Sequence, residues 1–191
     1  AKTVKKDRIN NGAMDNASGT AVLLETARVF SQMPAPKRSI LFVAVTAEEK
    51  GLLGSDYYAN NPTVPVTAMV ANINLDMPIL LWDFTDVIAF GANHSNLAET
   101  VSNAANKLGL KLSPDPWPEQ AIFTRSDHYS FVKQGVPSVF LAPGLATADN
   151  PEAGAKIFAD FFATKYHMPA DEFHDDFNDN AIKKFADVNV M

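Results

Sequence analysis

The sequence predicts an α/β fold, a three-layer α/β/α sandwich with a mostly parallel central sheet, formed by residues 1–191 as one domain. Short apolar segments rich in β-branched residues alternate with longer segments in which apolar residues recur at helical spacing. Acidic residues follow several of the short apolar segments, and open α/β sheets place their ligands at the ends of strands. With 191 residues, the chain is long enough to bury a sizeable core within a single domain.

In the first half of the chain, a polar and lysine-rich stretch over residues 1–14 is expected to form a loop. A helix should begin after Asp15 and Asn16, because apolar residues then recur at helical spacing until Pro34 ends the pattern. The next expected elements are a strand over residues 40–45, a short helix over 51–60 and a strand over 66–75. The first of these strands is short, apolar and partly β-branched, which is typical of a strand buried on both faces.

In the second half of the chain, helices and strands continue to alternate. The expected elements are a strand over residues 86–90, an amphipathic helix over 95–108, a short helix over 127–134, a strand over 138–141, a helix over 151–166 and a last helix over 180–190. This alternation predicts helical crossovers between strands and therefore a largely parallel sheet.

The composition restricts the classes of partner. The formal net charge is −6, from 22 acidic against 16 basic residues, which argues against nucleic acid or an anionic membrane as a partner. No apolar run is long enough to span a bilayer. The chain contains no cysteine, so disulfide bonds and thiolate metal ligands are excluded.

Four positions along the chain carry side chains that could bind a divalent cation. Asp15 opens a helix, the pair Glu48 and Glu49 follows one apolar segment, Asp76 ends another, and His167 follows a long amphipathic segment. Carboxylates and imidazole suit zinc or a similar ion. Taken singly, each acid has an ordinary explanation, such as a helix N-cap or a solvated turn. Their shared placement at the ends of elements favours one common site.

Four motifs occur in order along the chain: GAMDNASG at residues 12–19, TAEEKGLLGS at 46–55, NLDM at 74–77 and YHMPADE at 166–172. Together they resemble the catalytic domain of the M28 family of zinc aminopeptidases, and the resemblance extends along nearly the whole chain. It implies the zinc-exopeptidase fold and the removal of N-terminal residues from a peptide substrate. It also implies a secreted or periplasmic protein, although we expect no signal peptide within this chain.

The resemblance also implies a dinuclear metal site. In the family, the residue that matches Asp15 bridges both zinc ions, and the peptide bond after it is cis. Asp76 matches a ligand of the first zinc, whereas Glu49 and His167 match ligands of the second. A bridging carboxylate is one way to hold two cations about 3.5–4 Å apart.

The two adjacent glutamates are expected to have different roles. Neighbouring residues in an extended backbone point to opposite sides, so they cannot easily serve the same metal. By resemblance, Glu49 is the metal ligand and Glu48 is the catalytic general base, which moves a proton from the attacking water to the leaving amine. Tyr166 matches the phenol that donates a hydrogen bond to the oxyanion of the tetrahedral intermediate.

Three residues are expected to bind the substrate. Arg125 and His128 lie in Arg-Ser-Asp-His, which resembles a family signature near the substrate site. We expect Arg125 to contact the substrate backbone and His128 to make a supporting hydrogen bond, without a metal role. Met77 begins a group that could form an apolar wall for the substrate side chain, with plain core packing as the alternative. The other members of that group are Leu80, Leu81, Trp82 and Phe84.

One part of the family site is missing from the sequence. Family members carry a His-x-Asp motif upstream of the first matching segment, and its histidine binds the first zinc, but residues 1–14 contain no histidine. The first zinc would therefore have only Asp15 and Asp76 from this chain. With Ala1 in place of an initiating methionine, this predicts an N-terminally truncated enzyme that lacks an upstream part of its parent chain and is inactive or nearly so in isolation.

Three alternatives stay open from the sequence alone. The chain could be a natural relative with a silent site, a glutaminyl cyclase, or a receptor domain that kept the fold and lost the metals. Tyr166 stands where cyclases usually carry tryptophan, which argues against the second alternative. The retained carboxylates and His167 argue against the third.

Overall fold

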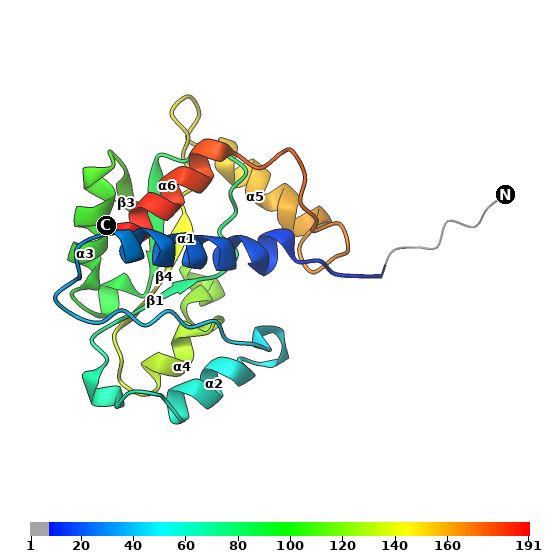
Figure 1. Cartoon of the computed structure of the whole chain (residues 1–191). Coiled ribbons are helices and arrows are strands. Elements are labelled where there is room, and N and C mark those ends of the chain that lie inside the picture. The colour runs from blue at the N-terminus through cyan, green and yellow to red at the C-terminus, as the bar shows by residue number, and fades with distance from the viewer. Residues whose placement is uncertain (1–7) are drawn as a thin grey trace.

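The computed structural model of the protein describes residues 8–191, so the part of the expected loop over residues 1–7 lies outside the described residues. Within the described residues, the centre of the fold is an open sheet of four strands in the order β1-β4-β2-β3 (Figure 1). The strands are β1 (Asn72–Leu75), β2 (Asp86–Phe90), β3 (Lys111–Ser113) and β4 (Ser138–Pro143). β1 is parallel to β4 and β2 is parallel to β3, whereas β2 and β4 are antiparallel. The sheet is thus mixed, with mostly parallel pairing as predicted.

Helices cover both faces of this sheet, which confirms the three-layer fold (Figure 1). The α-helices are α1 (Gly19–Gln32), α2 (Leu53–Asn60), α3 (Leu97–Lys107), α4 (His128–Val132), α5 (Ala153–Thr164) and α6 (Asp179–Val190). Short turns of other helix types are Ala13–Ser18, Glu48–Lys50, Val66–Ala68, Ala92–His94, Pro118–Gln120 and Ile122–Thr124. Among the described residues, no helix is both long and apolar enough to cross a membrane.

The main core lies between one face of the sheet and helices α1, α3 and α6. These helices contribute Val22, Val101 and Phe185, which pack with Val87 and Val139 from the strands. Inward-facing residues alternate along each strand, as the pleat of a sheet requires. Ile88, which follows Val87 in β2, therefore faces the other side of the sheet, where α4 packs against β1 and β4.

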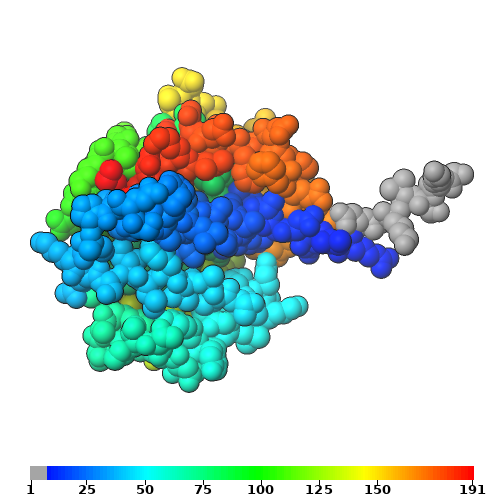
Figure 2. Space-filling model, in the orientation of Figure 1, coloured from blue at the N-terminus to red at the C-terminus, as the bar shows by residue number. Residues whose placement is uncertain are grey.

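The expected buried strand over residues 40–45 is wrong. This segment is not a strand, and the exposed fractions of Ile40 and Leu41 are 44% and 53%. Figure 2 shows this part of the chain at the surface beside α1. Val43, Ala44 and Val45 face β1 across a small cavity of about 110 Å³. A ladder needs strands about 4.7–4.9 Å apart, so an apolar segment held off the edge of β1 cannot pair with it.

The expected strand over residues 66–75 is correct only at its end. Val66–Ala68 forms a turn of 3-10 helix, and only Asn72–Leu75 pairs with β4. The pairing begins where Asn72 lies opposite Ser138, the first residue of β4. The helices, β2 and β4 lie where the sequence places them, within a few residues at each end, whereas the short strand β3 was not expected.

Candidate metal and substrate site

Asp15 lies in a turn whose backbone is fixed from the opposite end of the chain. The carboxylate of Asp171 accepts hydrogen bonds from the backbone N–H groups of Met14 at 2.9 Å and Asp15 at 3.0 Å. The backbone oxygen of Asp171 also accepts from Ala13 at 3.2 Å. Gly12 has φ +63°, and a Cβ there would lie 2.3 Å from the backbone oxygen of Asp15, so only glycine fits. The cis Asp15–Asn16 peptide bond is confirmed.

Asn16 connects this turn to the loop that carries Asp76. Its side-chain oxygen accepts from the backbone N–H of Met77 at 3.0 Å and of Gly19 at 3.1 Å. Its side-chain nitrogen donates to the backbone oxygen of Leu75 at 3.1 Å. The start of α1 and the end of β1 are therefore held together on both sides of Asp76.

Glu48 and Glu49 lie in a turn of 3-10 helix that follows Ala47, a residue with φ +59°. Met77 and His167 also have positive φ, at +43° and +56°. Non-glycine residues rarely adopt this conformation, and such strain concentrates at functional sites. The turn sends the two glutamates in different directions. Glu48 lines the large cavity described below, whereas Glu49 approaches His167.

Asp15, Glu49 and His167 form a group with the dimensions of a metal site. One ligand atom from each lies within 4.8 Å of the others. The Nε2 atom of His167 is 2.8 Å from Oε1 of Glu49 and 3.3 Å from Oδ2 of Asp15. Tetrahedral zinc with bonds of about 2.0–2.2 Å separates its ligand atoms by about 3.3–3.6 Å. The two contacts of His167 lie within about an ångström of that separation, and no pair of ligand atoms in the group is more than 4.8 Å apart, so the group has the size of a zinc site.

Uncompensated negative charge at this point also favours a cation. Burial, together with the charges of Asp76 and Glu49, raises the pKa of Asp15 from 3.8 to about 6. Burial, followed by the charge of Asp76, raises the pKa of Glu48 from 4.5 to about 7. Burial likewise raises the pKa of Asp76. Strongly perturbed acids in a cavity are typical of functional sites.

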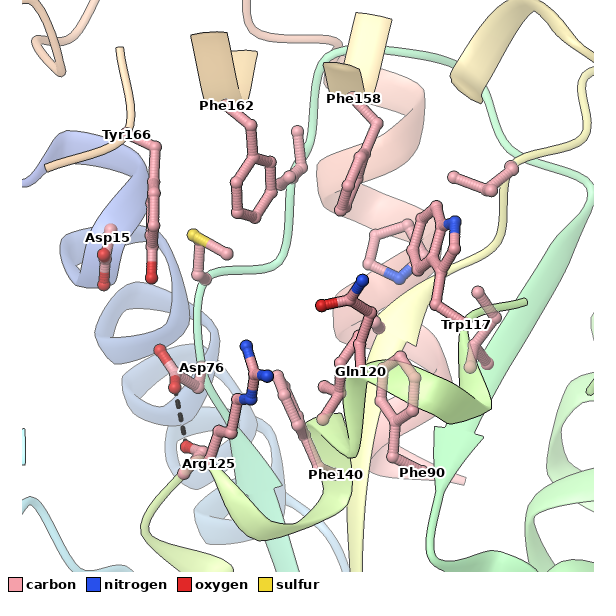
Figure 3. A pocket seen from close by; sticks show the side chains of 18 of the residues that line it. Asp15, Asp76, Phe90, Trp117, Gln120, Arg125, Phe140, Phe158, Phe162 and Tyr166 are labelled. Carbon is pink, nitrogen blue, oxygen red and sulfur yellow. Dashed lines mark hydrogen bonds between the residues drawn. The ribbon is translucent and has the colours of Figure 1, made fainter. Parts of the chain in front are cut away.

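Asp76 lies beside this group and not within it. The three-residue group does not include Asp76, although its carboxylate and that of Asp15 line the same cavity (Figure 3). Ser126 Oγ donates a hydrogen bond of 2.6 Å to Asp76, and Asn74 donates one of 2.8 Å to Ser126. Its role as a metal ligand stays a prediction.

A cavity of about 580 Å³ opens beside the metal group. Asp15, Glu48, Asp76 and His167 line one end, and Tyr166 and Arg125 lie close by (Figure 3). The rest of the lining is mostly apolar or aromatic, including Ile88, Phe90, Trp117, Phe140, Phe158 and Phe162. Binding sites for small molecules usually combine an apolar cavity of this size with a few polar groups.

Tyr166 lines the cavity beside His167, and its role toward the oxyanion stays a prediction. Its ring stacks on the imidazole of His167 with centroids 3.7 Å apart, and its hydroxyl points toward the acidic end of the cavity (Figure 3). Burial raises the pKa of Tyr166 from 10.0 to about 12, so the phenol keeps its proton at neutral pH. A protonated phenol can donate a hydrogen bond.

The expected substrate-binding residues divide into two groups. Met77 and Arg125 line the cavity, so their roles stay predictions. His128 is wrong as a substrate contact, because its side chain is fully buried and is absent from the cavity lining. Its ring packs against Phe123 and Phe140, and within residues 8–191 neither ring nitrogen has a hydrogen-bond partner of normal geometry.

The expected apolar wall is also partly wrong. Trp82 lines the cavity, but Leu80 and Phe84 are buried in the main core and do not. Trp117, Phe158 and Phe162, which were not expected from the sequence, supply the wall instead. Phe158 and Phe162 recur at helical spacing, which in the sequence indicates only the packing face of a helix. Nothing in that pattern shows that the face borders a cavity.

Carboxylates and a histidine gathered at one end of an apolar cavity, beside an open α/β sheet, are the kind of groups that a metal-dependent hydrolase needs. Comparison with known proteins gives the family. Residues 2–191 match the description "Peptidase family M28", and the chain belongs to that family.

Individual relatives agree with this assignment. The chain is 34% identical over 134 residues to "Aminopeptidase YwaD" of Bacillus subtilis (strain 168), over 66% of this chain and 28% of that protein. It is 47% identical over 66 residues to a "Probable zinc metalloprotease" of Pyrenophora tritici-repentis, over 35% of this chain and 15% of that protein. The chain therefore spans less than a third of the length of these two relatives.

Solved structures share the fold. The aminopeptidase from Aneurinibacillus sp. strain AM-1 superposes with a TM-score of 0.68 at 27% identity, over 94% of this chain and 38% of that one. A glutaminyl cyclase from Porphyromonas gingivalis gives a TM-score of 0.61 at 23% identity, over 94% of this chain and 62% of that one. The second likeness concerns the fold alone.

Proposed function

We propose that this chain carries the catalytic residues of a zinc-dependent aminopeptidase, which hydrolyses the first peptide bond of a peptide. The observation that carries the proposal is the convergence of Asp15, Glu49 and His167 at one end of an apolar cavity. The aminopeptidase and zinc metalloprotease relatives support it. Because the chain spans a small part of those relatives, the proposal concerns the enzyme that contains it.

Each residue of the site has a separate task. Asp15, Glu49 and His167 would hold a zinc ion, which polarises a carbonyl oxygen and lowers the pKa of a water molecule. Glu48 lines the cavity with a pKa raised to about 7, so its carboxylate can accept a proton from the attacking water and return it to the leaving amine. Tyr166 keeps its proton and donates a hydrogen bond to the developing oxyanion.

The division of labour between the two glutamates tests this proposal. In the enzyme that contains this chain, Glu48→Gln should keep its zinc and lose about 10²–10⁴-fold in kcat, because the proton acceptor is gone. Glu49→Gln should instead release zinc. The measurements are zinc content after dialysis and hydrolysis of an aminoacyl-anilide.

Glu99→Gln, at an exposed position of α3, is the matched control and should behave as the wild type. Full activity in Glu48→Gln would end the assignment of the base. Conversion of an N-terminal glutamine to a pyroglutamyl ring, without release of an amino acid from other peptides, would show a cyclase instead.

A further inference from the structure

Four aromatic rings form a continuous stack along one wall of the cavity, and we call this set the aromatic wall: Trp117, Phe158, Phe162 and Tyr166. The centroid distances are 4.7 Å between Trp117 and Phe158, 4.5 Å between Phe158 and Phe162, and 4.5 Å between Phe162 and Tyr166. The stack ends on His167, whose imidazole lies 3.7 Å from the ring of Tyr166. The wall thus runs from the metal group into the apolar part of the cavity (Figure 3).

The backbone of α5 explains this alignment. Phe158 and Phe162 are four residues apart in α5, so their side chains lie one above the other along one helix face. Tyr166 lies two residues beyond the end of α5, where its backbone N–H donates to the backbone oxygen of Phe161. Trp117 joins the stack from the loop that precedes the turn Pro118–Gln120. All four rings border the same cavity.

The stacking determines which part of each ring faces the cavity. Phe158 lies between Trp117 and Phe162, and Phe162 lies between Phe158 and Tyr166, with interplanar angles of 27–38°. Because neighbouring rings cover the faces of Phe158 and Phe162, these two rings present their edges to the cavity. The edge of an aromatic ring carries partial positive charge and prefers the negative face of another ring.

The opposite lining leaves little for a charged side chain to bind. Ile88, Phe90 and Phe140 from the sheet face the cavity, and the acids gather at the metal end. Arg125 and Gln120 are the polar residues nearest the middle of the cavity (Figure 3). A lysine side chain directed away from the metal would therefore be buried beside apolar groups without an anion, which is unfavourable.

We propose that the aromatic wall selects peptides whose first residue has an aromatic side chain, with Phe158 and Phe162 as the specificity-determining residues. This inference rests on the proposed aminopeptidase function, because it places the side chain of the first residue beyond the metal group. A ring inserted between the wall and the sheet would lie with its face against the edges of Phe158 and Phe162. An alanine side chain would leave that space unfilled.

Tryptophan fluorescence of the chain itself can report this binding. It contains two tryptophans, Trp82 and Trp117, and both line the cavity. Their fluorescence therefore reports occupancy of the cavity without any requirement for catalysis. The ligands to be tested are the amides of phenylalanine, leucine, alanine and lysine, each titrated into the zinc-loaded chain.

Phenylalanine amide should bind at least about tenfold more tightly than alanine amide, since even one methylene in an apolar site changes selectivity by about 10–200-fold. Leucine amide should bind with intermediate affinity, and lysine amide should bind most weakly. Phe162→Leu keeps an apolar side chain of similar size but removes the ring edge. In this variant the preference for phenylalanine amide over leucine amide should disappear, while the melting temperature stays close to that of the wild type.

Phe173→Ala is the matched control, because Phe173 is 73% exposed and does not line the cavity. Its affinities for all four amides should equal those of the wild type. Equal affinities for the four amides in the wild type would overturn the proposal, as would an unchanged preference in Phe162→Leu or no fluorescence response to any amide. Selective amide binding together with an active Glu48→Gln enzyme would refute the proposed mechanism and leave the specificity intact.

Discussion

At the scale of single residues, Asp171 lies outside the metal group but makes hydrogen bonds with the backbone beside two of the proposed ligands. It is buried, with 4% of its surface exposed, and it accepts backbone hydrogen bonds from Met14 and Asp15. Its own backbone N–H donates to Met168, the residue after His167. The carboxylate and the backbone of Asp171 therefore connect the segments of two proposed ligands, Asp15 and His167, which are 152 positions apart in the sequence.

Asp171→Asn should weaken zinc binding by about 10–100-fold, the usual effect of losing a partner that orients a ligand. The amide nitrogen cannot accept the hydrogen bond that one carboxylate oxygen now receives, so a backbone donor near Asp15 would be left unpaired. Competition with a chelating dye gives the zinc Kd, and circular dichroism reports the fold.

The control is Asp175→Asn, an exposed acid of the same segment, which should keep the wild-type Kd. A wild-type Kd in a folded Asp171→Asn variant would show that the backbone contacts of Asp171 are structural only.

At the scale of elements, the sequence predicts helices better than strands. Helical periodicity is a local property, so α1, α3 and α5 could be located from apolar spacing alone. A strand also needs a neighbour, and residues 40–45 have the composition of a strand without a ladder partner. The proposed ligands could be predicted because they follow recognisable motifs. The aromatic wall could not, because stacking between α5 and a distant loop has no sequence signature.

The contact between α4 and the sheet contains a fully buried histidine, His128. His128 begins α4, is fully buried, and packs against Phe123 and Phe140 of β4. Burial disfavours the charged form and lowers the pKa of His128 from 6.5 to about 4. In the unfolded chain this histidine takes up its proton near pH 6.5, whereas in the folded chain it stays neutral.

The free energy of unfolding should therefore fall as the pH decreases from about 6.5 to about 4, by about 1.4 kcal/mol per pH unit from this residue. The stability that neutral His128 provides is fully present above pH 6.5, because its folded pKa is the lower one. Acidic groups whose pKa is raised in the folded chain increase the free energy of unfolding as the pH falls. The effect of His128 is therefore measured by comparison with a variant that lacks it. Urea unfolding at pH 7.5 and pH 5.5 should show that wild type loses about 1.4 kcal/mol more than His128→Gln does. Equal losses in the two proteins would contradict a neutral buried His128.

At the scale of the whole molecule, the distribution of ligands sets how much metal the chain can hold. Asp15, Glu49 and His167 come from three separate parts of the sequence, and only the complete fold brings them together. Asp76 could complete a second position with Asp15, but residues 1–14 contain no histidine to add to that pair. Two carboxylates are fewer protein ligands than the three that a catalytic zinc usually takes.

Calorimetric titration of zinc into residues 1–191 should therefore give close to one tight equivalent, and the isolated chain should show little hydrolysis of aminoacyl-anilides. His167→Gln should abolish the tight equivalent, whereas Asp76→Asn should leave its number unchanged. At free zinc about a hundredfold above Kd, binding should stabilise the fold by about 2.7 kcal/mol, because the unfolded chain does not assemble the three ligands. Thermal unfolding with and without zinc measures this difference independently of activity. Two tight equivalents with full activity would mean that a residue outside the three-ligand group, or one from a second copy of the chain, completes the other position.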